Sequence, residues 1–103
     1  MSNYVTVQKA ITNKQQIYAV YNGYKRQLCP HQIGSIKGVA HGFFYQFAGE
    51  DESGIARETE LNWRCFPLDE MREVMYIEGS FYPKGKFVMP PSGLDKVEVS
   101  IPA

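Results

Sequence analysis

The Asn22-Gly23 step constrains this chain more than any other feature, because it lies between two runs in which apolar and polar residues alternate. Asn-Gly is typical of the two-residue turn of a β-hairpin, where both central residues need a positive φ. A turn of this length also fixes which residues face each other across the hairpin. The predicted cross-strand pairs, all on one face, are Tyr21 with Tyr24, Ala19 with Arg26, and Ile17 with Leu28.

Arg26 is the one charged residue on that predicted face. Its guanidinium has to reach solvent or meet an anion, because an unpaired buried charge is very costly. One interpretation is a structural ion pair with an internal acid, for which Asp69 is the obvious candidate. The other interpretation is that Arg26 binds an anionic ligand. The sequence leaves both interpretations open.

The rest of the chain predicts one helix, several short strands and polar loops. Pro30 is expected to end the second hairpin strand, since proline donates no backbone hydrogen bond. The acidic stretch from Gly49 to Gly54 lacks the ligand spacing of a calcium loop and is expected to be solvated. The remaining elements are expected as a helix at Tyr4 to Lys14, strands at Val39 to Ala48, Leu61 to Leu68, Val74 to Glu78 and Lys96 to Ile101, a helical turn at Asp69 to Glu73 capped by Asp69, and an extended piece at Lys86 to Met89.

These elements predict a mainly β fold, namely a small SH3-like or Sm-like β-barrel of about five to six strands with one short N-terminal helix. At 103 residues the chain is expected to be a single domain. Residues 1–15 would form the helix and its lead-in, and residues 79–103 a loop and a C-terminal edge strand.

Charge and composition exclude several classes of function. The formal net charge is zero, so there is no global basic field to drive non-specific binding of nucleic acid. No apolar run reaches the length of a signal peptide or of a membrane span. The two cysteines are therefore expected to be free thiols in the cytoplasm, and no membrane partner is expected.

An ordered set of motifs extends over about residues 5 to 78. The late motif is Arg64-x-Phe66-x-Leu68-Asp69-x-Met71, and the earlier pieces are Ala10-Ile11, Tyr21, Asn22-Gly23, Arg26, Pro30 and Gly42-Phe43-Phe44-Tyr45. In this order they resemble the WYL domain family. The Trp-Tyr-Leu triplet that names the family is replaced by Phe43-Phe44-Tyr45 or Phe44-Tyr45-Gln46, and the usual helix-turn-helix domain is missing, so the resemblance is to a freestanding module.

The resemblance implies a non-catalytic, ligand-sensing or regulatory module of the kind found in bacterial transcription regulators. It implies an anionic ligand, either a nucleotide or a single-stranded nucleic acid, held in a groove lined by arginine and tyrosine. Arginine forks bind phosphate and aromatic faces stack on bases. Carried over by position, the site residues are Tyr21, Arg26, Tyr45, Arg64, Lys25 and Phe44.

A second hypothesis is a protein–protein interaction or self-association module in which the arginines are structural. An enzyme is not expected, because no local signature of a nucleophile, a phosphate loop or a paired-carboxylate site is present. A zinc site formed by Cys29, His31, His41 and Cys65 is disfavoured, because the usual ligand spacings are missing. No cofactor or metal is therefore expected.

Overall fold

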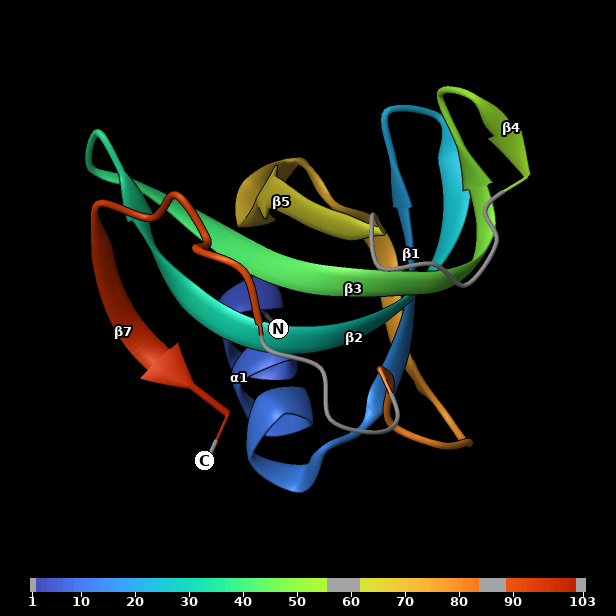
Figure 1. Cartoon of the computed structure of the whole chain (residues 1–103), viewed down its shortest axis with the longest axis horizontal. Helices are drawn as coiled ribbons and strands as arrows, with labels where there is room; N and C mark the ends of the chain where they lie inside the picture. The colour runs from blue at the N-terminus through green and yellow to red at the C-terminus, as the bar shows by residue number, and fades with distance from the viewer. Residues whose placement is uncertain (1, 56–61, 84–88, 102–103) are drawn as a thin grey trace.

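Antiparallel strands form most of the protein, which is seen in a computed structural model that describes residues 2–55, 62–83 and 89–101 (Figure 1). The mainly β prediction with one short helix is confirmed. The elements in chain order are α1 (Asn3–Asn13), β1 (Gln16–Tyr21), β2 (Tyr24–Ile36), β3 (Val39–Asp51), β4 (Gly54–Ile55), β5 (Trp63–Pro67), the 3-10 helix η1 (Leu68–Glu70), β6 (Arg72–Ile77) and β7 (Lys96–Ser100). No helix in this described part is long and apolar enough to cross a membrane.

The strands are arranged in the order β4-β3-β2-β1-β6, with β5 paired to β3 and β7 paired to β2. The predicted barrel is wrong in its closure, because β5 and β6 form no ladder with each other among the described strands. The two strands are joined by η1, and helix α1 is bonded to this junction. The Asn3 side chain of α1 donates to the backbone oxygens of Leu68 and Met71, each at 2.8 Å. The helix therefore satisfies two backbone oxygens of the segment between β5 and β6.

The hairpin prediction is confirmed in every pair. Ile17 faces Leu28, Ala19 faces Arg26, and Tyr21 faces Tyr24. Asn22 and Gly23 have φ values of 55° and 79°, as a turn of this kind requires.

The prediction that Pro30 ends its strand is wrong. Strand β2 continues to Ile36 and pairs with β3 over most of its length. Pro30 lies opposite Phe44, and the register shifts between Pro30 and Gln32. A bulge tolerates a residue without a backbone N–H, so the strand bends at this position and does not stop. A second tight turn, at Lys37 and Gly38, then reverses the chain into β3.

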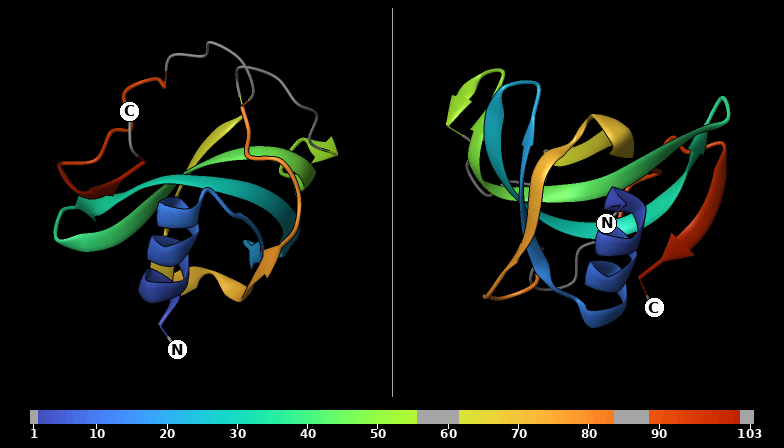
Figure 2. Two further views of the ribbon diagram at one scale, coloured as in Figure 1. Left: turned by 90° about the horizontal axis from the view of Figure 1, so that it is seen from below. Right: turned by 180° about the vertical axis from the view of Figure 1, so that it is seen from behind.

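Helix α1 lies where the apolar spacing predicted it, shifted by one residue at each end. The Ser2 side chain accepts a hydrogen bond from the Val5 backbone N–H and caps the helix, which ends at a left-handed Lys14. Figure 2 shows α1 packed against one side of the curved β2–β3 pair. The core between them consists of Val7, Ala10, Ile11, Ile17, Ala19, Leu28, Ile33, Phe44, Phe66, Leu68 and Met71.

The later elements agree with the predictions in place and differ in detail. Strand β6 begins two residues before the predicted strand, and β7 is confirmed as a strand beside β2. The predicted Asp69 cap is wrong, because Asp69 lies inside η1, whose first turn has no side-chain cap. Two parts of the predictions lie outside the described residues. They are most of the extended piece from Lys86 to Met89 and the first residue, Leu61, of the strand predicted at Leu61 to Leu68.

Candidate functional site

Arg26 is fully enclosed, with none of its surface exposed. Its Nε and one terminal nitrogen donate to the Tyr21 backbone oxygen at 3.3 Å, and the other terminal nitrogen donates to the Gln46 side-chain oxygen at 3.2 Å. The first terminal nitrogen also donates to both carboxylate oxygens of Glu52, at 3.0 and 3.1 Å. The guanidinium carbon lies 4.8 Å from the centre of the Phe66 ring. The guanidinium is therefore held by hydrogen bonds at each of its nitrogens and by ring contacts.

The acid that neutralises Arg26 comes from the acidic turn after β3. The sequence suggested Asp69 as the partner, and the structure has Glu52 in that place. The neighbouring Asp51 pairs with Arg64 at 2.9 Å. Two adjacent carboxylates thus meet the two arginines that the motifs had singled out. The stretch expected to be a solvated loop consists of the end of β3, a turn and the start of β4. Glu52 in the turn is 55% exposed, and both carboxylates are engaged in ion pairs.

Local hydrogen bonds hold both carboxylates in their charged forms. The Ser53 backbone N–H donates to Asp51 at 2.8 Å and is the main reason that the pKa of Asp51 lies below its ordinary value. The Asn22 side chain donates to Glu52 at 3.1 Å and is the main cause of the lowered pKa of Glu52. Bonds that favour the ionised form lower a carboxyl pKa. The hairpin turn at Asn22 therefore also positions the partner of Arg26.

Gly49 brings the acidic turn close to β2. It has a φ of 99°, and a Cβ at this position would lie 2.5 Å from the Lys25 backbone oxygen and 3.0 Å from the Arg26 Cα. Glycine alone combines a positive φ with so close an approach of two backbones. Without it, β3 would have to move away from Arg26, and Glu52 would move with it.

The six residues implied by the family resemblance do not lie on one surface. Tyr21 and Arg26 are in contact. Lys25, which precedes Arg26 in β2, is exposed. Phe44 is fully buried in the core, 5.6 Å from the centre of the Phe66 ring. Tyr45 points to the other side of β3, where it meets Trp63, and is 1% exposed. The Arg64 side chain is 23% exposed beside Asp51.

A cluster of aromatic side chains covers the face of β2, β3 and β5 that is opposite α1. Phe43 stacks on Trp63 at 5.0 Å, and His31 meets both Trp63 and Phe81 at 4.9 Å. The backbone of Tyr82 crosses this cluster. Its N–H donates to the Cys29 sulfur at 3.2 Å, and its oxygen lies 2.9 Å from His31 Nε2. Burial lowers the pKa of His31, so the ring is neutral near pH 7.

The Cys and His side chains considered for zinc are engaged separately. Cys29 and His31 contact Tyr82, whereas His41 Nδ1 lies 2.8 Å from the Val39 backbone oxygen. Burial raises the pKa of the Cys65 thiol. In the described ranges no three His, Cys, Asp or Glu side chains are grouped as a metal site would require.

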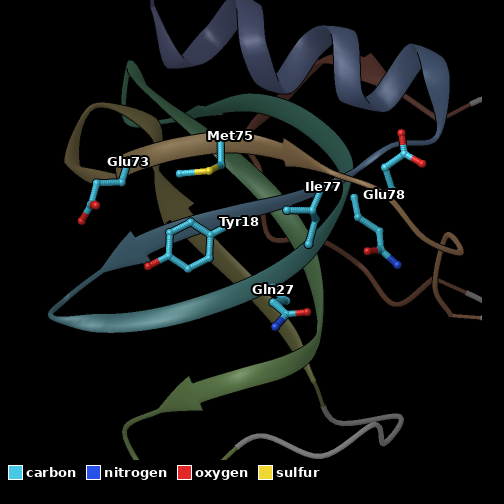
Figure 3. Close-up of a pocket in the computed structure, with 7 residues that line it drawn as sticks. Tyr18, Gln27, Glu73, Met75, Ile77 and Glu78 are labelled. Atoms are coloured by element: carbon cyan, nitrogen blue, oxygen red, sulfur yellow. The ribbon is translucent and has the colours of Figure 1, made fainter.

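An open groove of about 610 Å³ lies on the outer face of β1, β2 and β6 (Figure 3). The hairpin register places Tyr18 between Gln27 and Met75 on this face. Sequence reasoning missed this groove. The alternation from Val74 to Ile77 indicated which residues share a face, but nothing in it indicated a hollow. The lining residues are Gln16, Tyr18, Gln27, Glu73, Met75, Ile77 and Glu78.

The comparisons with known proteins identify no relative: no protein-family model, no curated protein and no solved structure matches the chain.

Proposed function

We propose that this chain is a non-catalytic binding module for another protein chain, with Arg26 and Arg64 in structural roles. The observation that carries the proposal is the enclosure of Arg26. The Arg26 side chain has no exposed surface and is paired with Glu52, so its charge is neutralised within the protein and is not accessible to a ligand. A fully buried arginine is stable when its donors are satisfied within the protein, as they are here.

The distribution of the aromatic side chains supports the same proposal. Stacking on a base requires an exposed ring face. Tyr45 and Phe44 have 1% and 0% of their surface exposed, so neither offers such a face without rearrangement. By contrast, Met75 on β6 is 50% exposed and lines the groove. Exposed apolar side chains around a groove are typical of surfaces that bind other proteins.

The fold supports a module of this size and kind. The strand path β6-β1-β2-β3-β5, with a 3-10 helix between β5 and β6, supports the proposal of an SH3-like or Sm-like domain. The WYL-like interpretation stays a prediction based on the ordered motifs. Binding of a nucleotide or a single-stranded nucleic acid stays the competing prediction, and it requires the Arg64 region to accept an anion that displaces Asp51.

The experiment is a titration of the protein at low ionic strength with a short oligothymidylate and, separately, with ADP, followed by nuclear magnetic resonance of the backbone amides. We expect no saturable, salt-dependent shift with either anion. The protein variants are Arg64→Ala and the control Arg72→Ala, which removes an exposed arginine of β6. Saturable binding by the wild type that is lost in Arg64→Ala and kept in Arg72→Ala overturns the proposal in favour of the anionic ligand.

A further inference from the structure

We infer that the groove over β1, β2 and β6 binds an extended segment of a partner protein that carries a basic residue two positions before or after an apolar one. This inference rests on the proposed function and specifies the partner. It concerns a surface away from Arg26 and Arg64, none of whose atoms line the groove.

The centre of the groove is apolar and its ends are acidic. Figure 3 shows Glu73 and Glu78 at opposite ends, with Tyr18, Met75 and Ile77 between them. Both glutamates are exposed, and no lysine, arginine or histidine lines the groove within the described residues. A long cationic side chain suits these surroundings, because its aliphatic stem packs on apolar atoms while its charge reaches a carboxylate.

The two acidic ends differ in their neighbours. Lys25 and Arg72 both lie opposite Val20, in the row of residues that follows Tyr18 toward the hairpin turn. Arg72 also directly precedes Glu73 in the chain, so this end of the face carries charges of both signs. At the Glu78 end β1 begins with Gln16, and the described strand pairs place no cationic residue opposite it. The charge of the face therefore favours a basic group of the partner at the Glu78 end.

Spacing along β6 sets the pattern of the partner segment. Residues of an extended backbone advance about 3.3 Å each, so Glu78, which directly follows the last residue of β6, lies about 10 Å beyond Met75. In an extended segment, side chains two positions apart point to the same side and are about 7 Å apart. The difference between these two distances is about 3 Å, which the length of a lysine or arginine side chain covers. In a partner segment with a basic and an apolar residue two positions apart, the basic side chain would thus reach Glu78 while the apolar one contacts Met75 and Tyr18.

The shape of the groove favours a peptide over a second copy of the chain as the occupant. A symmetric dimer would bring the same hollow against itself and leave much of its volume unfilled, whereas interfaces pack as densely as protein interiors. The volume of about 610 Å³ lies within the roughly 300–1,000 Å³ of typical ligand pockets. A few residues of a peptide fill such a space.

The backbone at Glu73 shows how its side chain comes to line the groove. The register of β1 and β6 shifts between Tyr18 and Val20, and Glu73 has a φ of 53° in the bulge. A left-handed backbone is unfavourable for a residue with a Cβ, and bulges commonly redirect a side chain. Here the redirected carboxylate lines the groove.

The test is a titration of isotope-labelled protein with the peptide acetyl-GTRTLTG-amide, in which arginine and leucine are two apart. The matched control peptide is acetyl-GTTRLTG-amide, which has the same composition but places the two side chains on opposite sides. We expect saturable shifts of the Tyr18, Met75 and Ile77 amides with the first peptide and weaker binding of the second. Equal binding of both peptides, or no binding of either, overturns the inference.

Protein variants locate the binding. We expect Glu78→Gln to weaken the first peptide by about two- to fivefold, as for one exposed ion pair, and Glu70→Gln to have no effect. We expect Met75→Thr to weaken it and Val39→Thr, which changes a side chain of equal 50% exposure, to leave it unchanged. Sedimentation velocity of the protein alone is expected to give a monomer. A dimer that Met75→Thr dissociates would overturn the choice of a peptide as occupant.

The two proposals can fail separately. If the peptides do not bind as expected, the groove is not the binding site, and the proposed protein-binding function would have to use another surface. Binding of oligothymidylate or ADP through Arg64 overturns the proposed function, whatever the peptide does.

Discussion

Glu52 closes the side of Arg26 that would otherwise face solvent, at a distance of 3.0 Å between the carboxylate and the guanidinium. The two side chains differ in surroundings, because Arg26 has no exposed surface and the Glu52 side chain is 55% exposed. The pair therefore consists of a buried cation and an anion that covers it from the outside. The position of Glu52 depends on the acidic turn, which depends in turn on Gly49.

Substitution of Gly49 by alanine should loosen this arrangement. Its φ of 99° and the 2.5 Å approach of a Cβ to the Lys25 oxygen both oppose a side chain. We expect Gly49→Ala to lower the free energy of unfolding by about 2–4 kcal/mol, measured by urea denaturation. The control is Gly38→Ala, at a φ of 79° with no atom within 4 Å. A loss no larger than that of the control would show that the close approach is unimportant.

Protonation of His31 should destabilise the protein in mildly acidic solution. Burial lowers the pKa of His31 in the folded state, while the unfolded chain takes up a proton near pH 6.5. The contribution to stability is therefore complete above pH 6.5 and is lost as the pH falls toward the folded pKa. We expect His31→Gln to remove this loss. Identical pH profiles of the melting temperature for both proteins between pH 7 and 5 would contradict the prediction.

Asp51 and Glu52 should produce a separate loss of stability at lower pH. The Ser53 N–H and the Asn22 amide lower the pKa values of these two carboxyl groups in the folded state. Their contribution is present above the unfolded values of about 4 and disappears as the pH falls through the lower folded values. The double variant Asp51→Asn/Glu52→Gln should flatten the melting profile below pH 4. The variant Asp69→Asn/Glu70→Gln, also neutral at two positions, is the control, and an equal flattening in it would contradict the assignment to Asp51 and Glu52.

The bulge residue Glu73 should tolerate asparagine better than alanine. Asparagine adopts a positive φ more readily than other residues with a side chain, whereas alanine does not. Both substitutions remove the carboxylate from the groove, so their difference reports on the backbone. We expect Glu73→Asn to be more stable than Glu73→Ala by up to about 1 kcal/mol in urea denaturation. The reverse order would argue against a left-handed backbone at this position.

The hairpin was predictable because its turn residues and its alternating strands are adjacent in the sequence. The turn residues set the pairing of Ala19 with Arg26, and this pairing raised the question of how Arg26 is compensated. The answer was not predictable, because Glu52 reaches Arg26 only through the pairing of β2 with β3. That register shifts twice, between Gln27 and Leu28 and between Pro30 and Gln32. Bulges of this kind change which residues meet, and alternation alone does not locate them.

The barrel was predicted wrongly and the groove was missed for a similar reason. Both depend on how distant elements meet in space. The contact of Asn3 with Leu68 and Met71 joins residues more than sixty positions apart. Glu73 lines the groove from a bulge that the alternating pattern of β6 does not show. Side-chain periodicity assigns residues to faces, while long-range contacts decide the shape of those faces.

The structural role of Arg26 is tested most directly by the free energy of unfolding of Arg26→Ala. Removal of this side chain leaves a cavity and takes the donors from the Tyr21 oxygen and the Gln46 side chain. We expect a loss of about 3–5 kcal/mol in urea denaturation, compared with less than about 0.5 kcal/mol for the exposed Arg72→Ala. An Arg26→Ala protein as stable as the Arg72→Ala protein would contradict the structural role and would return Arg26 to the candidates for ligand binding.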